Sequence, residues 1–391
     1  MLTLFLAGVI WLVYVYAGYP LALMAISCFR RVRPRSDESF LPEVSVLISA
    51  RNEEKDIAWK IEETFGWDYP EERLHVHVAS DASTDATDQI LDRLAKRYSR
   101  LHVYHLEERH GKAEALNLLS AQASGDILFF TDANAHIKPC FLRLMVRHFA
   151  DPKVGCVTGE TRNWEESGNG MGRASNVYFR YDALITWLEN LLGSALVCNG
   201  AVFCIRRELF ERLSSDLAND LETPIRIAHK GYWVLHEPAV WVSEQETSSL
   251  REDVERRRRI CGQGALGAWR LRSSLGGLRG WQFVSHKALR WLSLIPIIMI
   301  GVSTLGLAWG AWSAGLFIAE ITLLGLAGAG FAFLTMGRSS PAILSVPLYA
   351  LGGCVGALWG VLDALRGRRF AVWDAAGMSR GDGQAWGGQR S

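Results

Sequence analysis

Several features that define other classes of protein are absent from this chain of 391 residues. Lysine and arginine (42) are balanced by aspartate and glutamate (41) to a formal net charge of +1. No basic excess is left to neutralise a phosphate backbone, so we expect no nucleic-acid partner. The seven cysteines are scattered and form neither a CxxC pair nor a zinc-type spacing. This pattern argues against a zinc site and a disulfide framework, and it favours a reducing compartment.

Charge is itself nearly missing from two stretches, residues 1–29 and 291–365, whereas the segment between them carries almost all of it. The mean hydropathy of +0.07 is therefore an average over membrane-embedded and water-soluble parts. Residues 2–27 contain no charged side chain, over a length that exceeds the ~20 residues needed to cross a hydrocarbon core. They lack the basic start and the cleavage site of a signal peptide, so we expect a retained anchor.

Arginines predict how the chain is oriented in the membrane. The first apolar stretch is followed at once by Arg30, Arg31, Arg33 and Arg35. Because such residues remain in the cytoplasm, the polar body is expected there. We therefore expect a multi-pass protein of the cell inner or plasma membrane with a cytoplasmic body.

The C-terminal apolar stretch conflicts with this rule. It divides into candidate spans 291–309, 315–336 and 342–365, and three spans that begin in the cytoplasm end outside. The arginines within 366–369 are instead expected inside. One segment is therefore predicted to lie in the interface or to be re-entrant, with three or four spans overall. Residues 276–290 mix aromatic and basic side chains, which predicts an amphipathic interfacial helix or the charged beginning of the next span.

The polar body alternates between predicted strands and helices. A β-branched, apolar run at 44–50 is typical of a strand buried on both faces. Further strands are predicted at 74–79, 102–106 and 126–131, with helical patterns between them. Asp85 and Thr87 are expected to cap a helix and face solvent. This spacing predicts an α/β domain with a parallel, doubly wound sheet.

Polar side chains follow three of these strands at the point where each ends. Arg51 and Glu53 follow the first, Asp81 the second, and Asp132 with Asn134 the fourth. Ligands of such sheets collect at the carboxyl ends of the strands. A single acidic residue there is usually a helix cap, but three coincident cases predict a ligand site.

Six stretches resemble, in order, the motifs of membrane-bound family 2 glycosyltransferases, the family of cellulose, hyaluronan and chitin synthases. They are VSVLISARNEE, VASDASTDAT, GKAEALN, ILFFTDANA, NGAVFCIRRELF and NDLETPIRIAHKGYWVLHEP, between residues 44 and 238. The resemblance implies a GT-A fold, which is Rossmann-like with a mostly parallel sheet, flanked by transmembrane helices. It also implies transfer of a sugar from a nucleotide diphosphate. The predicted parts are an anchor (1–29), a GT-A domain (30–275), an interfacial helix (276–290), a membrane region (291–365) and a polar tail (366–391).

The resemblance implies roles on the donor side. Asp132 and Asn134 occupy the family's DxD motif, with asparagine in place of the second acid. They are predicted to hold Mg²⁺ or Mn²⁺, which offsets the charge that builds on the leaving diphosphate. Asp81 is the expected partner of the base, and a carboxylate suits the imide N–H of uracil, so a UDP-sugar is predicted. The other residues expected to line the donor pocket are Arg51, Glu53 and Lys112.

On the acceptor side, Asp220 falls on the catalytic acid of the family's ED motif, preceded by Asn219 in place of glutamate. It is predicted to deprotonate the acceptor hydroxyl as that oxygen attacks, which gives inversion at the anomeric carbon. Glu222 is the nearby competitor for this role, and a helix cap is the structural alternative for Asp220.

Arg259 matches the arginine of the family's QxxRW motif, whose glutamine and tryptophan are replaced by Arg256 and Ile260. The run 256–259 is predicted to bind the departing diphosphate or an anionic lipid-linked acceptor. Its alternative is a solvated basic surface near the membrane. The lost glutamine and tryptophan weaken the case for a processive synthase that moves its polymer across the membrane.

Three other functions compete with single sugar transfer to a polysaccharide or lipid-linked glycan. A processive polysaccharide synthase carries the QxxRW motif as well, of which this chain keeps only the arginine. A sugar-phosphate nucleotidyltransferase is expected to carry a glycine-rich phosphate loop after its first strand, and VSVLISARNEE has none. A transport subunit has no need for Asp132 and Asp220 together.

Overall fold

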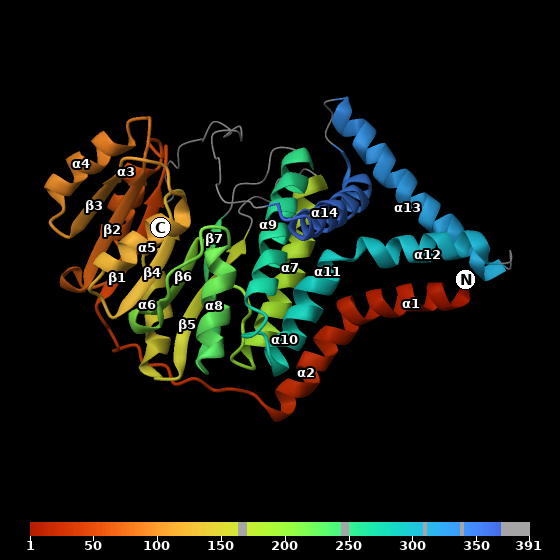
Figure 1. Ribbon diagram of the computed structural model, residues 1–391, viewed down its shortest axis with the longest axis horizontal. Coiled ribbons are helices and arrows are strands. Elements are labelled where there is room, and N and C mark those ends of the chain that lie inside the picture. Colours follow the sequence, from red (N-terminus) through yellow and green to blue (C-terminus); the bar gives the residue numbers. More distant parts are fainter. Residues whose placement is uncertain (163–169, 244–249, 308–310, 337–339, 369–391) are drawn as a thin grey trace, which may run out of the picture.

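The computed structural model describes residues 1–162, 170–243, 250–307, 311–336 and 340–368 (Figure 1). Its centre is a seven-stranded sheet with the strand order β3-β2-β1-β4-β6-β5-β7. The strands are β1 (Val44–Ala50), β2 (Leu74–Asp81), β3 (Leu101–Leu106), β4 (Ile127–Asp132), β5 (Val154–Arg162), β6 (Val202–Arg206) and β7 (Trp233–Ser243).

The sheet is mostly parallel. β1 pairs in parallel with both β2 and β4, and β2 pairs in parallel with β3. β6 is antiparallel to β4 and β5, whereas β5 and β7 are parallel. The predicted α/β class is confirmed, and β1 has the predicted bounds. β2 extends two residues beyond the prediction, so Asp81 is its last residue.

Helices cover both faces of the sheet, which explains why β1 is apolar without alternation. Val46 and Ile48 pack with α3 (Ile57–Phe65), α4 (Thr87–Arg97) and α6 (Phe141–Val146). Leu47 points to the opposite face and packs with α5 (Lys112–Gln122) and α8 (Asn219–His229).

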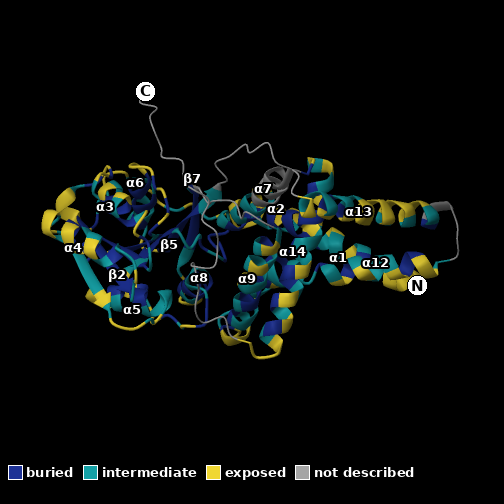
Figure 2. Cartoon of the chain, turned by 90° about the horizontal axis from the view of Figure 1, so that it is seen from above, coloured by how far each residue is buried: buried dark blue, intermediate teal, exposed yellow. Residues whose placement is uncertain are grey.

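Two long helices, α7 (Gly170–Asn190) and α9 (Leu250–Arg270), stand between the sheet and the apolar helices (Figure 1). The apolar helices are the continuous segment α1 (Leu2–Val13), η1 (Tyr14–Gly18) and α2 (Tyr19–Phe29), followed later by α12 (Leu294–Gly306), α13 (Ala311–Thr335) and α14 (Ala342–Leu365). Many of their apolar side chains are exposed, most clearly on α12 and α13 (Figure 2).

Three helices in the described part of the chain are long and apolar enough to cross a membrane, in Leu2–Phe29, Ser313–Thr335 and Ala342–Leu365. The remaining candidate is a bent pair, Gly277–Trp291 with Leu294–Gly306, whose halves meet at 57°. The predicted amphipathic segment is therefore a separate helical piece, made of α10 (Gly277–Phe283), η5 (Val284–Ala288) and α11 (Leu289–Trp291). Its place in the interface stays a prediction.

A buried polar cluster joins the first apolar segment to the rest of the molecule. The carboxylate of Glu189, on α7, accepts a hydrogen bond from the Tyr19 hydroxyl at 2.6 Å and lies 2.8 Å from His286 Nδ1. Asp182 lies about two helical turns before Glu189 on α7 and pairs with Arg290 at 2.7 Å. These contacts connect α2, α7 and the 277–291 segment, and they satisfy polar groups whose burial would otherwise cost free energy.

Candidate active site

The loops after β1 and β2 hold each other in place. Arg51 Nη1 donates to the carbonyl oxygen of Asp81 at 2.9 Å. The Glu53 amide donates to Thr87 Oγ1 at 2.8 Å, and Thr87 is fully buried. The prediction that Thr87 faces solvent is therefore wrong, because its hydroxyl satisfies a backbone amide of the neighbouring loop. Asp85 does bind the beginning of α4, by accepting from the Thr87 amide at 3.0 Å.

Asp81 is buried and both of its carboxylate oxygens accept backbone hydrogen bonds. Oδ1 accepts from the His110 amide at 2.7 Å and Oδ2 from the Gly111 amide at 2.9 Å. Asp81 thus fixes the loop that begins α5 and places Lys112, the first residue of that helix. Each carboxylate oxygen can accept a further hydrogen bond, so Asp81 is still able to bind a nucleotide base. That contact stays a prediction.

Lys112 and Asp132 meet at the carboxyl edge of the sheet. Lys112 Nζ lies 2.5 Å from Asp132 Oδ1, and both side chains are more than a third exposed. Asn134, two residues after β4, is exposed as well. In the described residues, no group of three or more His, Cys, Asp or Glu side chains is arranged around a metal position. One carboxylate with one amide suits Mg²⁺ or Mn²⁺ that takes its remaining ligands from water and substrate phosphates.

Asp220, the second residue of α8, is packed against the loop before β6. Its backbone oxygen accepts from the Cys198 amide at 2.8 Å. A Cβ on Gly200 would lie 3.2 Å from Asp220 Oδ2, so the loop approaches the carboxylate closely because glycine stands there. Burial raises the pKa of Asp220, the charge of Lys112 opposes the rise, and that of Asp132 adds to it. The pKa of Asp220 thus responds to the charges of both Lys112, at the beginning of α5, and Asp132, at the end of β4.

Glu222, the competing base, is engaged elsewhere. It is fully buried, and its carboxylate accepts from the Ser214 amide at 2.9 Å and pairs with Arg226 at 2.5 Å. These bonds fix the loop before α8 and satisfy the charge. Asp220 is therefore the better placed of the two to receive a proton.

The arginine run on α9 divides into two pairs. Arg258 Nε lies 2.5 Å from Asp363 Oδ2 on α14, and Arg257 stacks over Tyr349 of the same helix at 4.6 Å. Arg259 lies on another side of α9, where burial and Arg256 lower its pKa and the negative charge of Asp220 opposes that shift. Of the predicted run, Arg259 is thus the arginine whose pKa responds to the charge of Asp220.

Residues 45–214 match the protein family described as Glycosyl transferase family 2. The chain carries a family 2 glycosyltransferase domain. A beta-monoglucosyldiacylglycerol synthase from Synechocystis sp. is 32% identical over 192 residues, 45% of this chain and 40% of that protein. A probable glycosyltransferase of Bacillus subtilis, YdaM, is 30% identical over 237 residues, 56% of this chain and 55% of that protein. The chain spans about half the length of the curated relatives it matches.

The fold of the family 2 domain is also found in a solved structure. The mannosyltransferase PcManGT from Pyrobaculum calidifontis, in complex with GDP-Man and Mn²⁺, superposes with a TM-score of 0.68 at 23% identity. The match covers 91% of this chain and 99% of that one. The predicted GT-A fold is confirmed.

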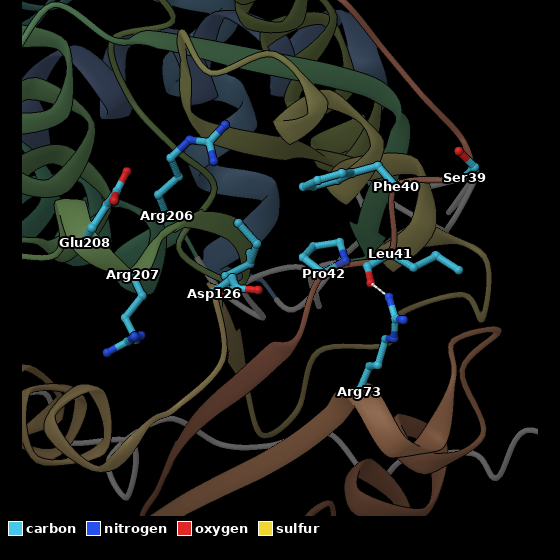
Figure 3. A pocket seen from close by; sticks show the side chains of 10 residues that line it. Ser39, Phe40, Leu41, Pro42, Arg73, Asp126, Arg206, Arg207 and Glu208 are labelled. Carbon is cyan, nitrogen blue, oxygen red and sulfur yellow. Dashed lines mark hydrogen bonds between the residues drawn. The ribbon is translucent and has the colours of Figure 1, made fainter.

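A cavity of about 600 Å³ lies at the opposite edge of the family 2 domain (Figure 3). It is lined by the segment before β1, by Asp126 just before β4 and by Arg206 at the end of β6. Parallel strands begin at this edge, whereas ligands of such sheets bind where the strands end. None of the predicted site residues lines it, so we do not assign the donor to this cavity.

The sequence analysis missed one buried pair beside the candidate metal site. Lys60 on α3 is completely buried and donates to the carbonyl oxygen of Ala135 at 2.6 Å, while Glu63 accepts from the Ile137 amide at 3.0 Å. Their charges lie 3.6 Å apart, and burial lowers the pKa of Lys60 and raises that of Glu63. The pair holds the loop that contains Asn134. The burial of Lys60 could have been predicted from the sequence, because helical spacing from Ile57 and Ile61 puts Lys60 on the apolar face.

We expect Lys60→Met to destabilise the family 2 domain. The change leaves Glu63 without its buried partner and the Ala135 carbonyl without a donor, which costs about 3 kcal/mol and lowers the apparent melting temperature by roughly 5–10 °C. Thermal unfolding of the full chain in detergent measures this. Lys55→Met, at an exposed position just before α3, is the matched control and leaves the melting temperature unchanged. Equal melting of all three proteins would contradict a role for Lys60.

Proposed function

We propose that the protein is a membrane-bound, inverting glycosyltransferase that transfers a sugar from a nucleotide diphosphate to a glycan or lipid-linked acceptor. The observation that carries the proposal is the grouping of Asp220, Lys112 and Asp132 at the carboxyl edge of the sheet, where the charge of each of the last two acts on the pKa of Asp220. This edge is where such folds bind their ligands.

The acceptor hydroxyl loses its proton to Asp220. A carboxylate whose pKa is raised binds that proton more strongly than an ordinary aspartate does. The freed oxygen attacks the anomeric carbon from the side opposite to the leaving diphosphate, so the configuration inverts. Gly200 lets the loop before β6 approach the Asp220 carboxylate closely.

The leaving diphosphate gains negative charge during the reaction, and cations stabilise it. Lys112 and Arg259, whose charges each interact with that of Asp220, supply fixed positive charge. Asp132 and Asn134 would hold a divalent cation, which when bound supplies further positive charge to the phosphates. Asp81 and Arg51 shape the part of the pocket where the nucleoside is expected.

The donor and acceptor classes follow from chemistry and from the relatives. A carboxylate at Asp81 suits the imide N–H of uracil, and guanine also presents N–H groups, so UDP-sugars lead and GDP-sugars come second. The named relatives include a synthase of a glucosyldiacylglycerol and a poly-beta-1,6-N-acetyl-D-glucosamine synthase of Staphylococcus aureus, 24% identical over 225 residues. The lipid acceptor is favoured, because the glutamine and tryptophan of QxxRW are missing.

Purified full-length protein in detergent tests the proposal. It is incubated with Mn²⁺ or Mg²⁺, a panel of UDP- and GDP-sugars, and diacylglycerol or short glycans, and release of nucleotide diphosphate is measured. We expect release that depends on both one donor and an acceptor, and a product with inverted anomeric configuration. Product size then separates a single transfer from polymerisation. No release with any donor, or retention of configuration, would contradict the proposal.

A further inference from the structure

We propose that α14 lies along the cytoplasmic surface of the membrane, as a lipid-facing cover of α9, and does not cross the bilayer. The inference concerns Ala342–Leu365, which by length and hydropathy alone qualifies as a span. It rests on the membrane location proposed above but not on the transferase activity.

The first observation is the closeness of α14 to α9. A Cβ on Gly360 would lie 2.1 Å from the backbone oxygen of Arg258, and one on Gly356 would lie 2.6 Å from that of Val254. Only glycine permits such an approach between two helix backbones. α9 is in turn fixed to the family 2 domain, because Arg270 binds both carboxylate oxygens of Asp216 at 2.6 Å. The position of α14 therefore follows that of the cytoplasmic domain.

The second observation is a set of polar contacts along the same interface. Near the end of α14, Asp363 is buried and pairs with Arg258 at 2.5 Å and with Arg368 at 3.4 Å. Trp359 stacks over Arg258 at 3.9 Å. A helix that crossed the bilayer from the cytoplasmic side would carry Asp363 to the far side, away from Arg258 on α9.

The third observation is the path of the chain. α1 and α12 pack together, and a Cβ on Gly306 would meet Met1 at 2.9 Å, so the end of α12 adjoins the beginning of α1. α13 then returns, and a Cβ on Gly330 would lie 2.7 Å from the backbone oxygen of Leu344 near the beginning of α14. Both views show α12 and α13 extending away from the sheet while α14 lies beside α9 (Figures 1 and 2).

The outer face of α14 fits lipid. Large apolar side chains recur there and are 39–78% exposed: Ile343, Val355, Leu362 and Leu365. An apolar stripe of this kind, opposite a face packed on protein, is the pattern of a helix that lies in the membrane interface. Exposed Arg366 and Arg368 follow it directly, where anionic lipid headgroups attract basic side chains.

This placement resolves the conflict in topology. With α1 to α2, the bent pair that ends in α12, and α13 as three crossings, a chain that begins outside returns to the cytoplasm before α14, and the arginines after α14 lie inside as the positive-inside rule requires. The placement also implies a structural role for α14. By binding Arg257 and Arg258, α14 fixes the rotation of α9, and Arg259 lies on another side of that helix, where the charge of Asp220 acts on its pKa. The candidate site then lies next to the lipid surface.

Single cysteines at the two ends of α14 test the placement. Pro341→Cys and Arg366→Cys, both at exposed positions, are introduced into the full chain after the native cysteines have been replaced. A membrane-impermeant maleimide is applied to spheroplasts and to inverted vesicles. Glu71→Cys, on the exposed surface of the family 2 domain, marks the side on which that domain lies. Arg368→Cys, also at an exposed position, is a second probe of the later end if Arg366→Cys does not accumulate.

We expect both ends of α14 to react from the same side as Glu71→Cys, each at least tenfold more than from the opposite side. Reaction of the two ends from opposite sides would overturn the placement of α14 and leave the transferase proposal intact. Absence of the chain from the membrane fraction would overturn the membrane location and this placement with it.

Discussion

Replacing Asp220 with asparagine is expected to lower kcat/KM for sugar transfer by about 10²–10⁴-fold. The amide keeps the shape of the side chain but does not take a proton, so the acceptor hydroxyl attacks without assistance. The hydrogen bond from the Cys198 amide goes to the backbone oxygen of Asp220 and survives the change. We therefore expect the melting temperature and the binding of donor to change little. Initial rates of nucleotide diphosphate release across a range of acceptor concentrations measure the loss.

Glu211→Gln is the matched control for Asp220→Asn. Glu211 is an exposed acid on the loop before α8 that pairs with Lys230 at 2.8 Å, and its removal leaves kcat/KM unchanged. The pH profile gives an independent readout. The base acts only when ionised, and burial raises its pKa. The rate of the wild type should therefore fall, as pH decreases, at a higher pH than an ordinary aspartate would produce. Full activity of Asp220→Asn would show that another group is the base.

The sheet and most of its ligand edge could be predicted from the sequence, for a physical reason. A strand buried on both faces requires a run such as residues 44–50, and the chain's polar side chains gather where such runs end. Asp81, Asp132 and Lys112 accordingly lie at that edge. Thr87 could not be predicted, because its burial depends on an amide of the other loop.

The arginine run at 256–259 shows a second limit of prediction from the sequence. Four consecutive arginines on a helix point in different directions, and sequence order does not say which neighbour each one meets. Asp363, which lies 105 positions from Arg258 along the chain, decides that Arg258 serves the contact with α14. The apolar segments are similar in this respect, since hydropathy identifies α14 as a candidate span but does not report the glycine contacts that hold it against α9.

Asp132→Ala is expected to lower kcat/KM by about 10²–10³-fold. Asp132 is the one carboxylate at the end of β4, so its loss removes the strongest ligand available to a divalent cation and leaves Lys112 without its 2.5 Å partner. The charge of Asp132 also acts on Lys60, so the neutral alanine leaves the local charge more positive. Because the cation and the donor phosphates bind together, we expect a higher Mn²⁺ concentration for half-maximal rate. A Mn²⁺ titration of nucleotide diphosphate release measures both effects.

Two further variants make the metal assignment specific. Asp126→Ala removes an exposed acid just before the same strand, at the edge where β4 begins, and leaves both the rate and the Mn²⁺ dependence unchanged. Asn134→Asp supplies the second acid of the DxD pattern. Since ligand charge sets the affinity of oxygen sites for divalent cations, this variant should reach half-maximal rate at a lower Mn²⁺ concentration than the wild type. A Mn²⁺ dependence that is the same in Asp132→Ala, Asn134→Asp and the wild type would remove these two residues from the metal site and leave the neutralisation of the diphosphate to Lys112 and Arg259.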